Sequence, residues 1–258
     1  MKFTSGAILS LIVLGGFLAA VPARADDTPA ACEVPDYLVS SDNVLPKVAD
    51  VIKAGRALNI LVVGSRSSTI NLGVDTNAAE AAAYPGQMQA ALKAKLPSIE
   101  VNVSLEIQAK KTAEDVAAGL SKLLEGKKPT LVIWQTGTVD AMRSVDPDDF
   151  RTAIDEGVVA LQEAGADVIL VNPQYSPRTE SMISASPDLD NMRVVAQEHE
   201  VPLFDRFAMM KNWSESGEFD LFSPVHGSEL AKRVHSCLGR ALSEFILAAA
   251  HPKPTQDN

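Results

Sequence analysis

The chain has 258 residues, of which 33 are acidic and 23 are Lys or Arg, so its formal net charge is −10 at pH 7. This acidity argues against nucleic acid as a partner, because binding to a phosphate backbone depends on basic patches. The length suits one α/β domain once a targeting segment has been removed.

The first 25 residues have the pattern of a signal peptide. Lys2 provides a positive start, residues 8–20 form an apolar run that is short for a membrane span, and Ala23-Arg24-Ala25 fits a small-x-small cleavage site. An uncleaved N-terminal anchor is the alternative. We expect cleavage and export to the periplasm or the medium, which leaves a mature chain with no stable membrane span.

Strand-like and helix-like stretches alternate along the rest of the chain. Residues 26–58 read as a polar arm followed by a helix over 35–58, and residues 251–258 read as a disordered tail. Apolar runs predict strands at 60–64, 99–105, 131–135, 168–171 and 201–204, separated by predicted helices at 84–96, 112–124, 146–165 and 189–200 and followed by one at 228–249. This alternation over residues 59–250 predicts a three-layer α/β/α sandwich with a mainly parallel sheet of about five strands.

The two cysteines, Cys32 and Cys237, lie near opposite ends of the expected mature chain. In an oxidising compartment a disulfide between them would tie the N-terminal arm to the last helix. Two unpaired buried thiols are the alternative. We expect the disulfide.

A turn rich in hydroxyl groups follows the first predicted strand. The strand ends at Gly64, and Ser65 and Ser67 come directly after it, on either side of Arg66. The carboxyl end of a parallel strand is where open α/β sheets bind ligands and place catalytic groups. Ser65 and Ser67 are therefore candidate nucleophiles, although such turns also serve simply to cap the next segment.

Acyl transfer also needs a base and groups that stabilise an oxyanion. His226 precedes the last predicted helix and is the candidate base, although a residue there can also simply start a helix. Thr138 and the backbone N–H groups around Gly137 are candidate oxyanion donors. Asp140 stands in the same turn and completes this group of ligand-binding candidates.

The order of elements resembles an SGNH/GDSL-type hydrolase, in a subgroup whose first block is similar to Gly-Ser-Ser-Ser-Thr. The resemblance covers residues 59–245 and is carried by residues 60–69, Tyr84-Pro85, 131–140, 165–178 and 201–204. It implies an SGNH-like α/β domain with a first-block serine as nucleophile. It also implies a C-terminal histidine as base and an oxyanion hole built from the first block, a glycine and an asparagine.

The chain departs from this pattern at most signature positions. The position two residues after Gly64 is Arg66, and a guanidinium cannot act as a nucleophile. The second-block glycine falls near Lys110, and the third-block asparagine falls on Val139. Only His226 matches plainly, which leaves Thr138, Arg66 and Lys110 as groups that could stabilise an anion.

Two hypotheses follow. The first is an exported hydrolase, weak or atypical, that removes an acyl or acetyl group from a small-molecule or polysaccharide ester or from a lipid. The second is a catalytically silent SGNH fold that binds an anionic ligand or an envelope partner, as the replacement of the signature residues suggests. The sequence shows no zinc spacing, P-loop or dinucleotide fingerprint, so we expect neither a metal nor a cofactor.

Overall fold

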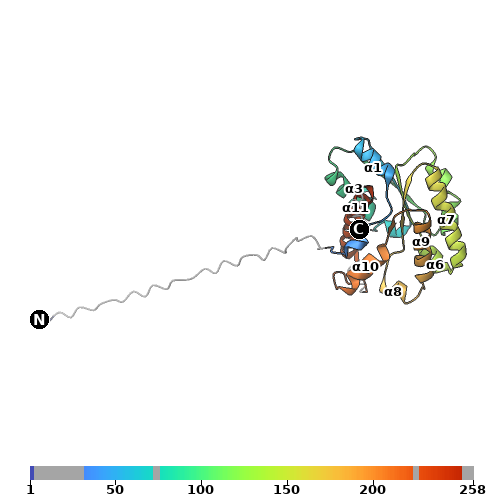
Figure 1. The fold of residues 1–258 in the computed structure, drawn as a ribbon. Coiled ribbons are helices and arrows are strands. Elements are labelled where there is room, and N and C mark those ends of the chain that lie inside the picture. Colours follow the sequence, from blue (N-terminus) through green and yellow to red (C-terminus); the bar gives the residue numbers. More distant parts are fainter. Residues whose placement is uncertain (3–31, 72–75, 223–226, 252–258) are drawn as a thin grey trace, which may run out of the picture. The chain divides into compact units, whose positions relative to one another are not determined.

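The computed structural model describes residues 1–2, 32–71, 76–222 and 227–251 (Figure 1). Most of the predicted signal peptide, the first part of the arm and the tail from residue 252 lie outside these ranges, as does His226. None of the helices within them is both long and apolar enough to cross a bilayer.

A parallel sheet of five strands forms the centre of the domain. The strands are β1 (Leu58–Gly64), β2 (Val101–Ile107), β3 (Leu131–Gln135), β4 (Asp167–Val171) and β5 (Leu203–Phe204). Their order in the sheet is β2-β1-β3-β4-β5, and every neighbouring pair is parallel. The chain therefore reverses its winding direction between β1 and β3, and open α/β sheets bind ligands at the carboxyl ends of two such strands.

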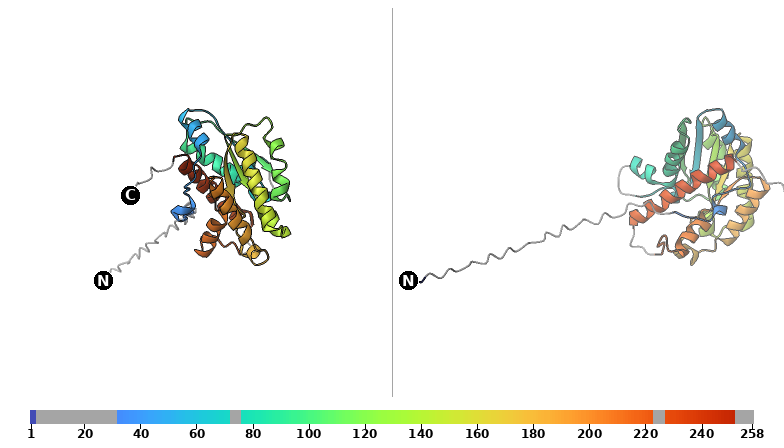
Figure 2. Two further views of the ribbon diagram at one scale, coloured as in Figure 1. Left: turned by 45° about the vertical axis from the view of Figure 1, so that its right-hand side comes forward. Right: turned by 60° about the vertical axis from the view of Figure 1, so that its left-hand side comes forward.

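Helices cover both faces of the sheet, which confirms the predicted three-layer sandwich (Figures 1 and 2). Helices α1, α3 and α11 pack on one face, and α4, α5, α7 and α9 pack on the other. The helices are α1 (Pro46–Lys53), α2 (Thr76–Ala82), α3 (Tyr84–Lys95), α4 (Ala113–Ala117), α5 (Leu120–Leu124), α6 (Thr138–Arg143), α7 (Pro147–Glu163), α8 (Pro177–Glu180), α9 (Ser186–Glu198), α10 (Arg206–Glu215) and α11 (Gly227–Ala250), with short 3-10 turns η1 (Asp36–Leu38) and η2 (Arg66–Ser68).

Two predicted helices differ from the structure in extent. The stretch 35–58 is helical only in η1 and α1, because Pro46 occupies the first turn of α1 and the preceding loop is held by tertiary hydrogen bonds. The Asn43 amide donates to the Val201 carbonyl at 2.9 Å, and the Leu45 N–H donates to the Ala249 carbonyl at 3.0 Å. The predicted helix 112–124 is divided into α4 and α5 at Gly119.

Helix α10 was not predicted, and it proves important for the site. Asp205 is its N-cap and accepts a hydrogen bond from the Ala208 N–H at 2.9 Å. The same carboxylate accepts from the Asn172 amide, which follows β4. These contacts fix the start of α10, and with it Arg206, at the carboxyl end of the sheet.

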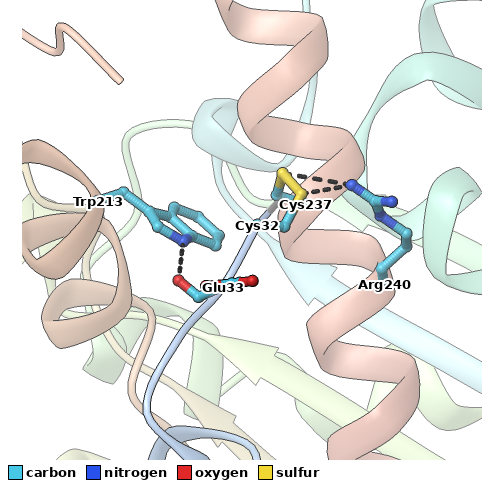
Figure 3. The surroundings of a disulfide bond; sticks show 5 residues. All are labelled: Cys32, Glu33, Trp213, Cys237 and Arg240. Carbon is cyan, nitrogen blue, oxygen red and sulfur yellow. Dashed lines mark hydrogen bonds between the residues drawn. A yellow bond between two sulfur atoms is a disulfide. The ribbon is translucent and has the colours of Figure 1, made fainter. Parts of the chain in front are cut away.

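The predicted disulfide between Cys32 and Cys237 is present, with the two Cα atoms 5.3 Å apart (Figure 3). The guanidinium of Arg240 donates to both sulfur atoms. Next to the bond, the indole N–H of Trp213 donates to the Glu33 carbonyl at 3.1 Å. The N-terminal segment that begins at Cys32 is thereby fastened to α10 and α11.

Candidate functional site

The turn after β1 packs its hydroxyl groups into a small space. Ser65 caps η2, and its Oγ accepts a hydrogen bond from the Ser67 N–H at 3.3 Å. Ser68 is fully buried and shares a hydrogen bond of 3.1 Å with the Tyr84 hydroxyl. A Cβ added at Gly64 would collide with the Ser68 side chain, so the turn needs glycine at this position.

The side-chain amide of Gln135, at the end of β3, connects three serines. Its Nε2 donates to Ser65 Oγ at 2.8 Å, and its Oε1 accepts from Ser67 Oγ at 3.3 Å and from Ser68 Oγ. Gln135 is only 3% exposed, so water does not compete with these contacts. The amide therefore fixes the hydroxyl groups of β1 against the end of β3, where the sheet reverses its winding.

Arg206 places a buried positive charge behind Ser67. Both terminal nitrogens of its guanidinium lie 3.3 Å from Ser67 Oγ, and one lies 3.5 Å from the Ser67 carbonyl oxygen. The side chain is 1% exposed, its Nε has no partner, and no carboxylate within the described ranges pairs with it. Burial lowers the pKa of Arg206 to about 10, so it remains a cation at neutral pH. Such a charge favours negative charge on the Ser67 oxygen.

His235, on α11, is a neutral hydrogen-bond donor at this site. Its Nδ1 accepts the Tyr84 N–H at 3.0 Å, so the ring proton is on Nε2. Burial, reinforced by the charge of Arg206, lowers the pKa of His235 to about 4. The lone pair on Nδ1 accepts the backbone N–H of Tyr84 in α3, and Nε2 carries the ring proton. The imidazole therefore has no lone pair left with which to take a proton from a serine.

A cleft of about 720 Å³ opens above the hydroxyl groups. Its lining brings together several residues predicted from the sequence, namely Ser65, Arg66, Ser67, Lys110 and Thr138. It also includes His235, which the sequence analysis missed. Gly64 and Gly137 line a small adjoining hollow together with Gln135.

A second hollow of about 650 Å³ adjoins the cleft. The two spaces share Thr138, Met142 and Gln174 in their linings. Phe207 and Met182 add apolar surface to the second hollow. The second hollow therefore extends the space that opens beside the serines.

Two residues predicted to stabilise an anion, Lys110 and Thr138, line the cleft. Lys110 has a left-handed backbone with φ of 62°, a conformation that costs a non-glycine residue about 1 kcal/mol or more. Its carbonyl accepts a hydrogen bond of 2.9 Å from Arg143. The Oγ1 atom of Thr138 is buried and has no hydrogen-bond partner among the described residues.

Asp140 lies outside the lining of the cleft. Its Oδ1 accepts the Ala113 N–H at 2.8 Å, which ties α6 to α4, and it forms no ion pair with Arg66. Its Oδ2 and the Oδ2 of Asp188 are both buried without a partner. Burial raises the pKa of Asp140, and burial together with the charge of Asp140 raises the pKa of Asp188 to about 6. Asp140 thus has a structural contact here.

The predicted base, His226, lies outside the described residues, so its role stays a prediction. No group of three or more His, Cys, Asp or Glu in the described part of the chain is placed to hold a metal ion. The missed residues, Arg206 and His235, share a signal that could have revealed them. Each is a polar residue at a buried position of a helix, and buried polar groups need specific partners.

Solved structures with this fold include several esterases. A two-domain esterase (CEX) active on acetylated mannans is 17% identical with a TM-score of 0.65, and the match covers 85% of this chain and 57% of that one. An acetyl xylan esterase from Geobacillus stearothermophilus (a variant of Axe2) is 18% identical with a TM-score of 0.58, covering 74% and 96%. A G-D-S-L family protein from Desulfitobacterium hafniense DCB-2 is 16% identical with a TM-score of 0.51, covering 72% and 98%. At these identities the likeness establishes the fold.

The chain has no significant match among curated proteins. A sequence model of the Non-GDSL lipase-like family, however, matches residues 31–252, which is most of the chain. The match includes every strand of the sheet and the whole hydroxyl network. The protein therefore belongs to the Non-GDSL lipase-like family, in agreement with its resemblance to SGNH/GDSL-type hydrolases.

Proposed function

We propose that this protein is an exported ester hydrolase with Ser67 as its nucleophile. The observation that carries the proposal is the position of Ser67 Oγ, which lines the cleft and lies 3.3 Å from both terminal nitrogens of Arg206. A buried cation at this distance stabilises the negative charge that develops on Ser67 Oγ as a base takes its proton, and so makes this hydroxyl a stronger nucleophile.

In the proposed reaction, Ser67 Oγ forms a bond to the acyl carbon of the ester while a base takes its proton. The alcohol then leaves with a proton as the carbon–oxygen bond of the ester breaks. Water attacks the acyl-serine in a second step, which releases the acid and restores the hydroxyl. His226 is our sequence-based candidate for the base, because the Nδ1 lone pair of His235 already accepts a hydrogen bond from the Tyr84 N–H.

Ser67 is a better candidate than Ser65. Ser65 Oγ accepts hydrogen bonds from the Ser67 N–H and from Gln135 Nε2, so its position is set by the cap of η2. The Ser67 hydroxyl lies 3.1 to 3.3 Å from Ser65, Gln135 and Arg206, and it caps no helix. It can therefore turn towards a base without the loss of a cap, and Arg206 stabilises the negative charge that forms on it.

The substrate we propose is a small-molecule or polysaccharide ester with an acetyl or longer acyl group. The cleft and the hollow that adjoins it support this, since together they offer room for the acyl part and the alcohol part of an ester. Two of the structural relatives are described as an acetyl xylan esterase and as an esterase active on acetylated mannans. Thr138, which lines both the cleft and the adjoining hollow, is our candidate donor to the ester carbonyl.

Export is part of the proposal. The disulfide between Cys32 and Cys237 supports it, because such bonds persist in oxidising compartments and are rare in the cytosol. Residues 1–25 would then be a cleaved signal peptide. Mass spectrometry of the protein recovered from the periplasm or the medium should find an N-terminus near Asp26.

Purified mature protein should release acid from activated short-chain esters. Ser67→Ala should lower the rate by about a thousandfold or more, whereas Ser65→Ala, the matched control, should lower it by much less. A fluorophosphonate probe should label Ser67, and peptide mapping would identify the modified residue. His226→Ala should also lose activity, with His251→Ala as its control. Turnover that survives Ser67→Ala would rule out the proposal.

A second candidate function is a catalytically silent domain that binds an anionic ligand. The favouring observation is again Arg206, a buried cation that no carboxylate in the described part of the chain pairs with, combined with a Ser67 hydroxyl whose proton already has the acceptor Gln135. In this case the fluorophosphonate probe would not react and no ester would be hydrolysed. Serine-dependent labelling would exclude this function in favour of the hydrolase.

A further inference from the structure

The charged residues that line the cleft are cations, whereas the protein as a whole has a negative net charge. The chain carries 33 acidic residues against 23 Lys and Arg. The described lining nevertheless contains three cations, Arg66, Lys110 and Arg143, and no Asp or Glu. An acidic protein with an exclusively cationic cleft focuses a positive potential on that cleft.

The three cations come from separate segments that meet only in the fold. Arg66 belongs to η2, Lys110 to the loop between β2 and α4, and Arg143 to the end of α6. Arg143 is fixed to the Lys110 carbonyl at 2.9 Å. Neither Arg66 nor Lys110 has an ion pair with any carboxylate in the described part of the chain.

Depth adds to this arrangement. Arg206 is buried against Ser67 and has no ion pair within the described ranges, while Arg66, Lys110 and Arg143 are exposed residues of the cleft lining. A guanidinium binds the planar oxygens of a carboxylate or phosphate through paired hydrogen bonds. Arg206 is positioned for the oxygen at the reacting centre, which leaves the three outer cations for a second negative group on the same molecule.

We propose that the substrates of this cleft are anionic esters, in which a carboxylate or phosphate close to the ester bond is held by Arg66, Lys110 and Arg143. This inference rests on the proposed hydrolase function and specifies its substrate class. It predicts selection by charge in addition to selection by the shape of the acyl group.

The test compares acetyl esters that differ only in charge. The substrates are para-acetoxybenzoate, para-acetoxyphenyl phosphate and the neutral para-acetoxybenzamide, with each enzymatic rate divided by the uncatalysed rate. We expect kcat/KM to be at least about tenfold higher for one of the two anions, and the preferred anion distinguishes carboxylate from phosphate. Added salt should reduce this preference, because it screens exposed charges.

Substitutions then locate the effect. We expect each of the variants Arg66→Gln, Lys110→Gln and Arg143→Gln to raise KM for the anionic ester and so to lower its kcat/KM by about three- to tenfold. The kcat/KM for the neutral ester, para-acetoxybenzamide, should change little. Lys232→Gln, on the exposed part of α11 and paired with Glu229, is the matched control and should have no effect on either. Equal preference for neutral and anionic esters, or variants that affect both equally, would overturn the inference.

A binding measurement separates the failure of this inference from the failure of the proposed function. Calorimetry with the product para-hydroxybenzoate, and with inorganic phosphate, is carried out on the Ser67→Ala protein. If Arg66→Gln weakens this binding while the unsubstituted protein hydrolyses no ester, the anion site is retained and the hydrolase is rejected. Hydrolysis of the neutral ester with no binding of either anion would do the reverse.

Discussion

Arg206 and the pair Asp140–Asp188 are both buried charged sites, yet they differ in how they can respond to burial. Among the described residues, Arg206 forms hydrogen bonds to Ser67 alone, and Oδ2 of each aspartate has no hydrogen-bond partner. A carboxylate can bind a proton and become neutral, and the pKa of Asp188, raised to about 6, reflects this. A guanidinium remains charged at neutral pH even with its pKa lowered to about 10.

The consequence is that only one of the two sites supplies a permanent charge. Leaving a buried ion unpaired costs several kcal/mol, so Arg206 lowers the stability of the fold unless something offsets it. What it provides is a fixed positive potential on Ser67 Oγ. The aspartates instead bind or release a proton as the pH changes, and neither of them lines the cleft. The substitutions below test this difference.

The largest expected effect follows from Arg206→Met. Ester hydrolysis should fall by about a hundred- to a thousandfold, which is the range for the loss of one oxyanion-stabilising donor. The free energy of unfolding should stay unchanged or rise by about 1–2 kcal/mol, because an unpaired buried charge is replaced by an apolar side chain of similar length. Kinetics and urea denaturation measure the two quantities.

Arg206→Lys is the matched variant for this prediction. It keeps the charge and loses the paired contact with Ser67 Oγ, so we expect a loss of about tenfold. If Arg206→Met instead destabilised the protein strongly and its folded fraction kept full activity, Arg206 would have a structural role only.

Gly64→Ala disturbs the same site from the side of the hydroxyl groups. The new Cβ would collide with Ser68, whose hydroxyl is held by Tyr84 and Gln135. We expect a loss of about 1–3 kcal/mol in the free energy of unfolding, as for other overpacked positions. Gly119→Ala, where the nearest atom would be 3.5 Å from the new Cβ, should cost far less.

Asp188→Asn tests the second site through its pH dependence. The pKa of Asp188 is raised from 3.8 to about 6 on folding, so the folded state binds this proton more tightly than the unfolded chain. The resulting stabilisation is complete below about pH 4 and is lost as the pH rises through 6. At pH 8 the Asn variant should be more stable than the native protein by about 1–2 kcal/mol.

The difference between the two proteins should disappear near pH 4, where the native aspartate is also neutral. Thermal unfolding between pH 4 and 8 would follow this convergence. A constant difference at all pH values would show that Asp188 does not titrate in this range.

The smallest effect is expected at an exposed ion pair, Arg151–Glu198, whose side chains are 43% and 47% exposed. Arg151→Met should change the free energy of unfolding by less than about 1 kcal/mol and leave ester hydrolysis unchanged. A large effect on the free energy of unfolding or on ester hydrolysis would mean that exposed charges far from the cleft also matter. The difference that we draw between buried and exposed charges would then be wrong.

Much of the fold was predictable because local patterns and tertiary packing agree. Buried strands such as Leu131–Gln135 show uninterrupted apolar runs, and the helix expected from residue 112 begins there because Thr112 and Asp115 form a capping box at the start of α4. Where tertiary contacts decide, prediction failed. The loop before Pro46 is held irregular by residues more than 150 positions away, as the Asn43–Val201 hydrogen bond illustrates.

The site divides in the same way. Ser65, Arg66 and Ser67 were predicted because they follow a strand, and the position of a ligand at the end of a parallel strand is a property of the fold class. Arg206 was missed because its significance comes from the absence of a carboxylate around it, and sequence does not reveal which partners a buried side chain lacks. His235 was missed because its role depends on the Tyr84 N–H of another helix, which bonds Nδ1 and so leaves the ring proton on Nε2. The sequence does not show that these two residues meet.

The disulfide has one further consequence. Cys32 and Cys237 are 205 positions apart, and all five strands lie between them. The sheet is therefore enclosed in a covalent ring, and one protease cut anywhere between the two cysteines leaves both fragments attached. A nicked molecule would run as a single band on a non-reducing gel and separate into two bands only after reduction. The ring would therefore keep the two parts of the sheet together after many such cuts.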